Sequence, residues 1–295
     1  TVLRLGLLLY RAGMPPEALS ILTGKGEELG HALAAHPLIQ TLTFTGSREV
    51  GLSLPIHAGA KRIEMELDSV GGLIAAETAD PQQVAEVVAC CGFMLAGQSP
   101  SSIQHVWAHR RLFDALRDAL LQRIAGLRCG DPMEETTTLP PLIHPHALQR
   151  VVRWVQEALQ QGAQALTGAK AEPPFYLPTV LIGTPPHTTL YNEAAFGPVV
   201  LLHTYESPAE LLQQINRFSI GLRLAVYTRD IAEAFEIARH ARALSVHVND
   251  SPALPIDPII RGDMQEHHMC FEDMLQRIDR LSQAKYIGFG RMALF

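Results

Sequence analysis

Short apolar segments alternate with longer amphipathic segments along most of this chain, and that alternation restricts its fold more than any other feature. Strands that alternate with helices are typical of parallel βαβ units, whose right-handed crossovers place the helices on the faces of the sheet. We therefore predict an α/β fold. The expected strands are 19–22, 42–44, 62–67, 179–182, 199–202, 224–227, 245–248 and a last one near 286, and the expected helices are 2–10, 27–35, one ending near 58, 81–95, 112–127, 147–161, 208–216, 231–241 and 271–281.

Local signals define several helix ends. Asp80 is the expected N-cap of the helix that starts at Pro81, because a carboxylate accepts from the first backbone amides and proline is tolerated at the first helical position. Gly162 is expected to end the helix 147–161. The apolar residues 1–10 run on into Gly13 without a basic head or a clear cleavage site, which favours a helix over a signal peptide.

The composition narrows the class of partner. The chain has 295 residues, of which 47% are hydrophobic and 18% charged, enough for a core in one large domain or two smaller ones. A net charge of -6 gives no reason to expect a nucleic-acid partner. No apolar run is long enough to cross a bilayer, so no membrane partner is expected either.

The cysteine and histidine patterns give no reason to expect a metal site. The four cysteines are Cys90, Cys91, Cys129 and Cys270. Their spacing matches no zinc or iron–sulfur pattern, so we predict buried thiols and a reducing, cytoplasmic compartment. His267 and His268 are adjacent, and neighbours on a helix or strand do not face one ligand together, so a surface pair is expected.

A set of short motifs follows one order along the chain. They are Phe44-Thr45-Gly46-Ser47, Glu66-Leu67, Gly97-Gln98, Gly130-Asp131-Pro132, Phe196-Gly197-Pro198-Val199-Val200 and Val248-Asn249-Asp250. Each motif is short, but the ordered set resembles the NAD(P)-dependent aldehyde dehydrogenase superfamily over nearly the whole chain. The resemblance implies a partial Rossmann-like cofactor domain at 1–68, an α/β catalytic-type domain at 69–262, and a C-terminal helix and strand at 263–295 that return to the core or to a partner.

The resemblance also implies roles for individual residues. Glu66 stands at the position of the family's general base, and Pro100 stands at the position of its nucleophilic cysteine. The implied contacts to NAD or NADP are Gly24, Gly46, Ser47 and Phe196. The first half of the family's cofactor domain would precede the helix 2–10. A truncated sequence, a separate partner chain or a true loss would each explain why that half is not in this sequence.

Four segments depart from the family pattern. Pro100 has neither a nucleophilic side chain nor a backbone N–H, and without a thiol the covalent intermediate cannot form. Asp68 replaces a glycine, Ala194 replaces a glutamate that holds the nicotinamide ribose in the family, and Ile260 lies in an altered late segment, 258–263. A carboxylate at Asp68 would also raise the cost of ionising Glu66 beside it.

Neighbouring side chains are candidate substitutes for the missing thiol. The serines at 99, 101 and 102 each need an adjacent base to attack at neutral pH. A strand over 101–106 would point Ser101 and His105 to the same side, although no other feature marks that pair. Cys90 and Cys91 lie on the preceding helix, where packing is the expected role.

Three functions fit this sequence. We predict an aldehyde dehydrogenase-like protein that is catalytically degraded, a pseudoenzyme with a structural or regulatory role, because four separated site segments are altered together. The first alternative is an active NAD(P)-dependent oxidoreductase that converts a small aldehyde to an acid with a non-standard nucleophile or a partner chain. The second alternative is a dinucleotide-sensing module. Residues 285–289 resemble a strand that pairs across subunits in the family, so a homo- or hetero-oligomer is expected.

Overall fold

The structure, a computed structural model, describes residues 1–67, 70–217, 223–243 and 245–251. The chain divides into two units, Thr1–Glu66 and Leu67–Phe295, and each is considered by itself. No helix within the described ranges has both the length and the apolarity needed to cross a bilayer. Several predicted features lie outside the described residues: Asp68, Ile260, Cys270, the histidine pair 267–268, the helix 271–281 and the strand 285–289.

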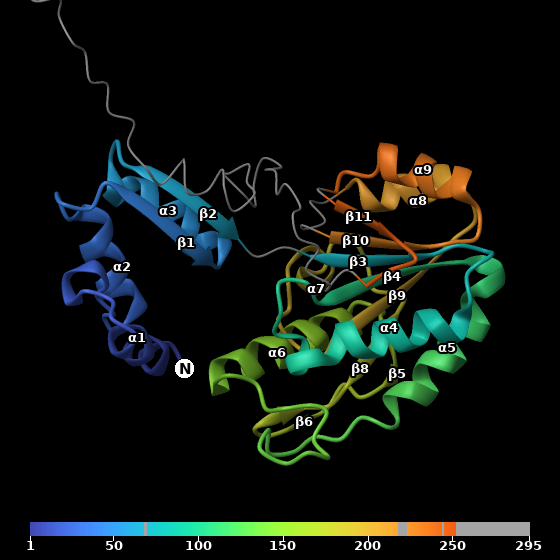
Figure 1. Cartoon of the computed structure of the whole chain (residues 1–295). Coiled ribbons are helices and arrows are strands. Elements are labelled where there is room, and N and C mark those ends of the chain that lie inside the picture. The colour runs from blue at the N-terminus through green and yellow to red at the C-terminus, as the bar shows by residue number, and fades with distance from the viewer. Residues whose placement is uncertain (68–69, 218–222, 244, 252–295) are drawn as a thin grey trace, which may run out of the picture. The chain divides into compact units, whose positions relative to one another are not determined.

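The first unit is a small α/β assembly, drawn in blue in Figure 1. Its elements are α1 (Val2–Arg11), the 3-10 helix η1 (Pro16–Ala18), α2 (Gly26–Ala35), β1 (Thr41–Gly46), α3 (Arg48–Ala58) and β2 (Arg62–Leu67). β1 and β2 are hydrogen-bonded neighbours in a two-stranded sheet. Ala34, Leu54 and Ala58 of the helices form its buried core against partly buried residues of the two strands. These elements confirm the predicted ones, with one exception.

The strand predicted at 19–22 is wrong. Residues 19–25 have no regular secondary structure. Ile21 packs on α1 instead, where a side chain at Gly6 would collide with it, and Leu22 is exposed. A strand gains stability by hydrogen bonding to neighbouring strands. Among the described residues of this unit, β1 and β2 pair only with each other, and the apolar run 19–22 packs on α1 without joining their sheet.

The second unit is built on a seven-stranded sheet. In the order β11-β10-β3-β4-β9-β8-β5, its strands are Ser245–Val248, Arg223–Tyr227, Gly71–Ala75, Ile103–His109, Val199–Tyr205, Thr179–Ile182 and Gln164–Thr167. Every neighbouring pair is parallel except β5 and β8. The remaining elements are α4 (Pro81–Phe93), η2 (Met94–Gly97), α5 (Arg110–Ile124), α6 (Pro145–Gln160), β6 (Ala171–Glu172), β7 (Phe175–Tyr176), α7 (Thr189–Asn192), α8 (Pro208–Ile215) and α9 (Ile231–His240).

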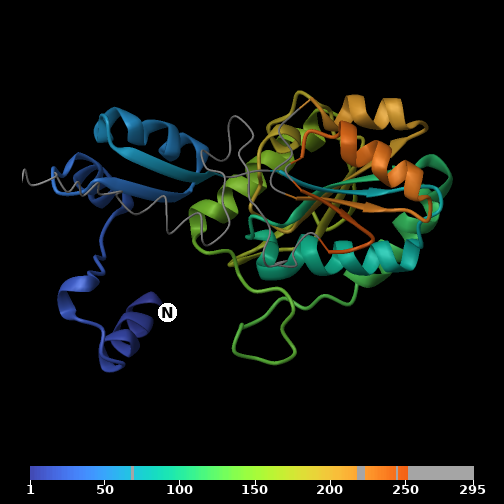
Figure 2. The same ribbon diagram turned by 45° about the horizontal axis from the view of Figure 1, so that its top comes forward.

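Helices cover both faces of this sheet. Figure 1 and Figure 2 show α4 and α5 on one face and α8 and α9 on the other. The larger core contains buried side chains of α4, α5 and α6, and a smaller core contains those of α8 and α9 packed on Trp107 of β4. Because β4 and β9 are parallel neighbours, the loops that enter them lie at the same edge of the sheet. Those loops carry the Gly97-Gln98 and Phe196-Gly197-Pro198 motifs.

The central strand β3 was not predicted, because it begins with two glycines, which are depleted in strands. Both glycines are required by close packing. A Cβ on Gly71 would collide with the Ser102 carbonyl oxygen, and a Cβ on Gly72 would lie 2.7 Å from the ring atom Cζ3 of Trp107. Glycine in a strand interior marks such a close approach. The strand is therefore determined by its neighbours β10 and β4 rather than by its own composition.

Candidate functional site

The segment that contains Pro100 forms a closed β-turn shortly before β4. The Ser102 N–H donates to the Ser99 carbonyl oxygen at 3.0 Å, and the Ser101 N–H donates to Ser99 Oγ at 3.3 Å. Proline is favoured at the second position of such a turn because its ring presets φ. Pro100 is exposed at the tip of the turn. Its role in the structure is to stabilise the turn at the position where the resemblance places a nucleophile.

Three consecutive residues before this turn adopt left-handed backbone conformations. The φ angles are 52° at Leu95, 56° at Ala96 and 71° at Gly97. A Cβ on Gly97 would lie 2.5 Å from the carbonyl carbon of Gly197 and closer still to its oxygen. The Gly97 backbone therefore rests directly on the loop that enters β9. Non-glycine residues in this conformation cost roughly 1–2 kcal/mol each, so the surrounding packing must hold the strained segment in place.

Gln98 connects the turn to a third segment. Its Oε1 accepts from the Ile143 N–H at 2.8 Å, and its Nε2 donates to the carbonyl oxygens of Leu95 at 3.0 Å and Pro141 at 3.4 Å. One side chain thus fixes the strained residues and the 141–143 segment together. The Gly97-Gln98 motif therefore has a structural role in this chain.

The Phe196 loop is the second strained segment of the site. Phe196 is half-buried and has a φ of 44°, which is unusual for a bulky residue. Gly197 beside it leaves no room for a side chain, since a Cβ there would lie 2.5 Å from Cγ2 of Val151 on α6. The structure therefore brings Phe196, an implied cofactor contact, into the same local cluster as the Pro100 turn. Strained backbone of this kind concentrates at binding sites.

Gln104 of β4 organises this loop, although the sequence analysis did not identify it. It is only 6% exposed. Its Nε2 donates to the carbonyl oxygens of Leu190 at 2.8 Å and Glu193 at 2.9 Å, and its Oε1 accepts from the Ala195 N–H at 2.8 Å. The signal that could have indicated it was a glutamine inside a strand that is mostly apolar. Ala194, the departure from the family pattern, lies within the segment that Gln104 holds.

Within the described part of the second unit, no activating base is bonded to the candidate substitutes for the thiol. Ser101 Oγ lies 3.1 Å from Ser99 Oγ, so the two hydroxyls bind each other. The strand predicted over 101–106 begins at Ile103, which leaves Ser101 in the turn. The Ser101–His105 pair does not form, since Nδ1 of the buried His105 bonds His203 Nε2 at 3.0 Å.

The thiol of Cys91 is also unsuited to attack. Cys91 is buried, with Sγ 3.2 Å from Ser251 Oγ, and burial is the main cause that raises the pKa of its thiol. A raised pKa leaves little thiolate at neutral pH. The prediction of a buried thiol is confirmed for Cys91 and wrong for Cys90, which is exposed, because adjacent positions on a helix face different directions.

In the first unit, Gly46 and Ser47 stand where β1 passes into α3. Ser47 is exposed, and its Oγ caps α3 by accepting from the Val50 N–H at 3.4 Å. Glu49 lies in the first turn of the same helix. The amides of a helix N-terminus favour an anion, whereas a carboxylate in the first turn already interacts with the positive end of the helix.

Gly24 precedes α2 in a similar arrangement. It is exposed, and a Cβ there would lie 3.0 Å from Cδ1 of Leu29. Lys25, the nearest cation, is paired with Glu28 at 3.4 Å, and Glu27 adds a second carboxylate to the first turn. Two carboxylates oppose a phosphate at this position, so the loop fits a dinucleotide pyrophosphate poorly.

Glu66 lies near the end of β2 and is half-buried. Glu64, which the sequence analysis did not identify, is two residues earlier and only 4% exposed. Side chains two apart on a strand point to the same side, so two carboxylates share one side of β2. Nε of Arg62 lies 3.7 Å from Glu64 Oε1, and the Glu64 oxygens make no hydrogen bond within the described part of the chain.

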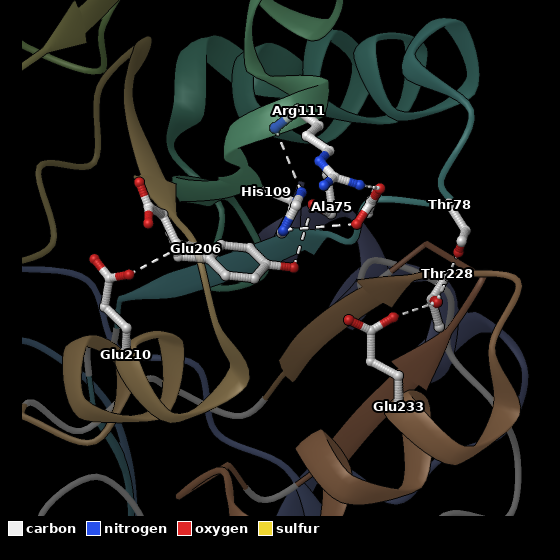
Figure 3. Close-up of polar contacts among 10 residues, drawn as sticks. Ala75, Thr78, His109, Arg111, Glu206, Glu210, Thr228 and Glu233 are labelled. Carbon is white, nitrogen blue, oxygen red and sulfur yellow. Dashed lines mark hydrogen bonds and ion pairs between the residues drawn. The ribbon is translucent and has the colours of Figure 1, made fainter.

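The opposite edge of the seven-stranded sheet, where β4 and β9 end, is occupied by paired polar groups (Figure 3). Glu77 contacts His109 Nε2 at 3.8 Å and Arg111 Nη1 at 2.6 Å. Glu233 accepts from Thr228 Oγ1 at 2.7 Å. These groups satisfy one another, which indicates a structural role. The described residues also contain no group of three or more His, Cys, Asp or Glu side chains placed to hold a metal ion.

Comparison with known proteins agrees with this fold. The sequence profile of the aldehyde dehydrogenase family matches residues 1–262. The 3-sulfolactaldehyde dehydrogenase of Priestia aryabhattai is 30% identical over 285 residues, which cover 97% of this chain and 60% of that protein. The non-phosphorylating aspartate-semialdehyde dehydrogenase of Halomonas elongata is 29% identical over 99% of this chain and 60% of its own length.

Solved structures show the same similarity. An NAD-dependent aldehyde dehydrogenase from Sinorhizobium meliloti matches with a TM-score of 0.90 and 28% identity over 95% of this chain and 57% of that chain. Aldehyde dehydrogenase 21 from Physcomitrella patens was solved with the reaction product succinate. It matches with a TM-score of 0.88 and 31% identity over 94% of this chain and 58% of that chain. The fold is thus the α/β fold of aldehyde-oxidising enzymes. The chain belongs to the aldehyde dehydrogenase family, and it spans about 60% of the length of the curated relatives named above.

Proposed function

We propose that this chain is a member of the aldehyde dehydrogenase family that has lost thiol-dependent aldehyde oxidation and serves a structural or regulatory role. The closed turn around Pro100 carries the proposal, because proline supplies no nucleophile where the family's chemistry requires a thiolate. The inactive alternatives around it add support: two serine hydroxyls bound to each other and a buried thiol with a raised pKa.

The division of the chain follows from the same proposal. Residues 1–68 would be the second half of a cofactor domain, 69–262 the catalytic-type domain, and 263–295 a segment that returns to the core or to a partner. Glu66 would stand at the position of the family's general base. The free thiols of Cys90, Cys91 and Cys129 favour a cytoplasmic location for this protein.

Production of reduced NAD or NADP from a panel of semialdehydes tests the loss of activity. The purified 295-residue chain is expected to show no turnover above that of its Glu66→Ala variant. Turnover that persists in Ser101→Ala and Cys91→Ala but disappears in Glu66→Ala would contradict the proposal. It would favour instead an active oxidoreductase with a non-standard nucleophile or a partner chain.

A second candidate is a module that binds NAD or NADP without chemistry. The strained Phe196 loop supports it, since its φ of 44° keeps the half-buried ring at the site cluster. The acidic first turns of α2 and α3 oppose it and predict weak binding. The change in melting temperature on addition of millimolar NAD or NADP tests this candidate. An increase that Phe196→Ala abolishes supports the module, and no increase rejects it.

Self-association is also proposed, through the strand expected at 285–289. Light scattering of the purified chain would show a dimer or larger species. A hetero-oligomer with a chain that supplies the remaining family segments is the other form of the proposal. A monomer that forms no complex with such a chain would reject both.

A further inference from the structure

The second unit contains a cavity that the functions discussed above do not use. Its volume is about 580 Å³, within the range of small-molecule sites, and it lies among β8, β9, α7 and α8. Its polar lining includes Tyr191, His203, Thr204, Gln213 and Arg217. The residues of the Pro100 turn are not part of the lining. The cavity is therefore a separate candidate site, built by this unit alone.

One wall of the cavity carries a pair of hydrogen-bonded imidazoles. His105 Nδ1 lies 3.0 Å from His203 Nε2, and the two rings stack with their centroids 5.0 Å apart. The backbone of Tyr191 opposes the lowering of the His105 pKa. In the bond between the two rings one nitrogen donates and the other accepts, and a neutral imidazole can take either role.

The remaining ring nitrogen of His203 is Nδ1. It has no hydrogen-bond partner among the described residues, and His203 lines the cavity. Burial lowers the pKa of His203 to about 4, and burial, followed by the charge of His203, lowers the pKa of His105 well below its usual value. Both rings are neutral at neutral pH, so His203 offers the cavity a hydrogen-bonding nitrogen and no charge.

Arg217 supplies the positive charge of the lining. It is exposed and makes no ion pair within the described part of the chain. Burial raises the pKa of Tyr191, and the charge of Arg217 acts to lower it. The guanidinium therefore lies close enough to the phenol to act on it. The carboxylate of the lining, Glu210, is engaged elsewhere: Oε2 accepts from the Glu206 N–H at 2.8 Å and Oε1 from Gln214 Nε2 at 3.3 Å. Figure 3 shows the Glu210 contact.

We infer that this cavity binds a small hydroxycarboxylate, whose carboxylate pairs with Arg217 and whose hydroxyl hydrogen-bonds with His203 Nδ1. Arginine is well suited to a carboxylate because its planar fork matches the two oxygens. A hydroxyl can both donate and accept, so it can pair with His203 Nδ1 in either tautomer of the ring. The inference does not depend on whether the Pro100 turn is catalytic.

Calorimetric titration of the full chain with three small probes tests the ligand's hydroxyl and its carboxylate separately. Lactate has both the hydroxyl and the carboxylate, propionate lacks the hydroxyl, and propane-1,2-diol lacks the charge. We expect lactate to bind roughly tenfold more tightly than either of the others, because each loses one polar contact. Equal affinities, or no lactate binding at tens of millimolar, would overturn the inference.

Variants assign the two contacts. Arg217→Gln should remove the preference for lactate over the diol, and His203→Phe should remove the preference for lactate over propionate. The matched control is Arg110→Gln, which removes an exposed arginine paired with Glu206 outside the cavity and should leave lactate binding unchanged. Should His203→Phe fail to fold, unchanged lactate binding in Arg217→Gln, at an exposed position, still refutes the proposed contact.

Discussion

Replacement of Gly97 by alanine tests whether the turn that carries Pro100 is held against the loop that enters β9. Gly97 has a φ of 71°, and a Cβ there would lie 2.5 Å from the Gly197 carbonyl carbon. Both partners of this contact are backbone, so neither can move aside as a flexible side chain would. Gly183 is the matched control, because its φ is 63° and its nearest neighbour, the Gly162 oxygen, would be 3.9 Å from a Cβ.

Both variants place a Cβ in left-handed backbone, and only Gly97→Ala also presses that Cβ against a neighbouring backbone. Gly183→Ala should lose about 1 kcal/mol of unfolding free energy, the cost of a Cβ in left-handed backbone. Gly97→Ala adds the cost of overpacking against a backbone, roughly 2–3 kcal/mol, for a total of about 3–4 kcal/mol. For a unit of this size each kcal/mol lowers Tm by about 2–4 °C, so Gly97→Ala should melt roughly 10 °C below the native protein.

Tryptophan fluorescence during urea unfolding measures both losses. The chain has two tryptophans, Trp107 and Trp154, and both lie in the second unit, so the signal reports that unit alone. We expect a clearly lower midpoint for Gly97→Ala than for Gly183→Ala. Losses that agree within about 0.5 kcal/mol would refute it, because the left-handed conformation would then account for the whole effect.

Three further predictions concern named side chains. The pKa of His203 is about 4 in the folded protein, below the ordinary 6.5, so its contribution to stability is complete above pH 6.5 and is lost as the pH falls toward 4. The whole loss is about 3 kcal/mol, of which about 2.5 kcal/mol falls between pH 7 and pH 4.5. The difference in unfolding free energy between these two pH values, measured by urea unfolding, should therefore be about 2.5 kcal/mol smaller in His203→Phe. Gln104→Leu should cost about 2–4 kcal/mol by leaving two carbonyls and one N–H without partners, whereas Gln164→Leu, exposed on β5, should cost under about 0.5 kcal/mol; urea midpoints compare them. Pro100→Cys should expose a thiol that reacts with a disulfide reagent yet produce no reduced NAD from semialdehydes, and turnover would show that the thiol was the only missing part.

Local patterns in the sequence were sufficient for most helices. Asp80 caps α4 as predicted, with Oδ1 accepting from the Gln82 N–H at 2.9 Å, and Pro81 is the first helical residue. Gly162 follows α6 with a φ of 112°. These features could be predicted because a helix and its caps are formed by residues close together in the chain.

Features that depend on distant segments could not be predicted. The glycines of β3 indicate no strand by themselves, and the segment is a strand because β10 and β4 hydrogen-bond to it from both sides. The apolar run 19–22 indicates a strand, yet among the described residues it pairs with no strand. In both cases the outcome was decided by the presence or absence of a neighbouring strand, which is a property of the assembled sheet.

For the candidate site, the sequence alone determined the family resemblance and the absence of a thiol at position 100, because both are properties of residue identity and order. Only the tertiary structure decided how that position is used. Gly97 rests on Gly197, Gln98 holds the 141–143 segment, and Gln104 holds the loop before Phe196. These contacts join residues that are far apart in the chain. Their geometry exists only once β4 and β9 are neighbours in the sheet, which is why no local pattern could reveal it.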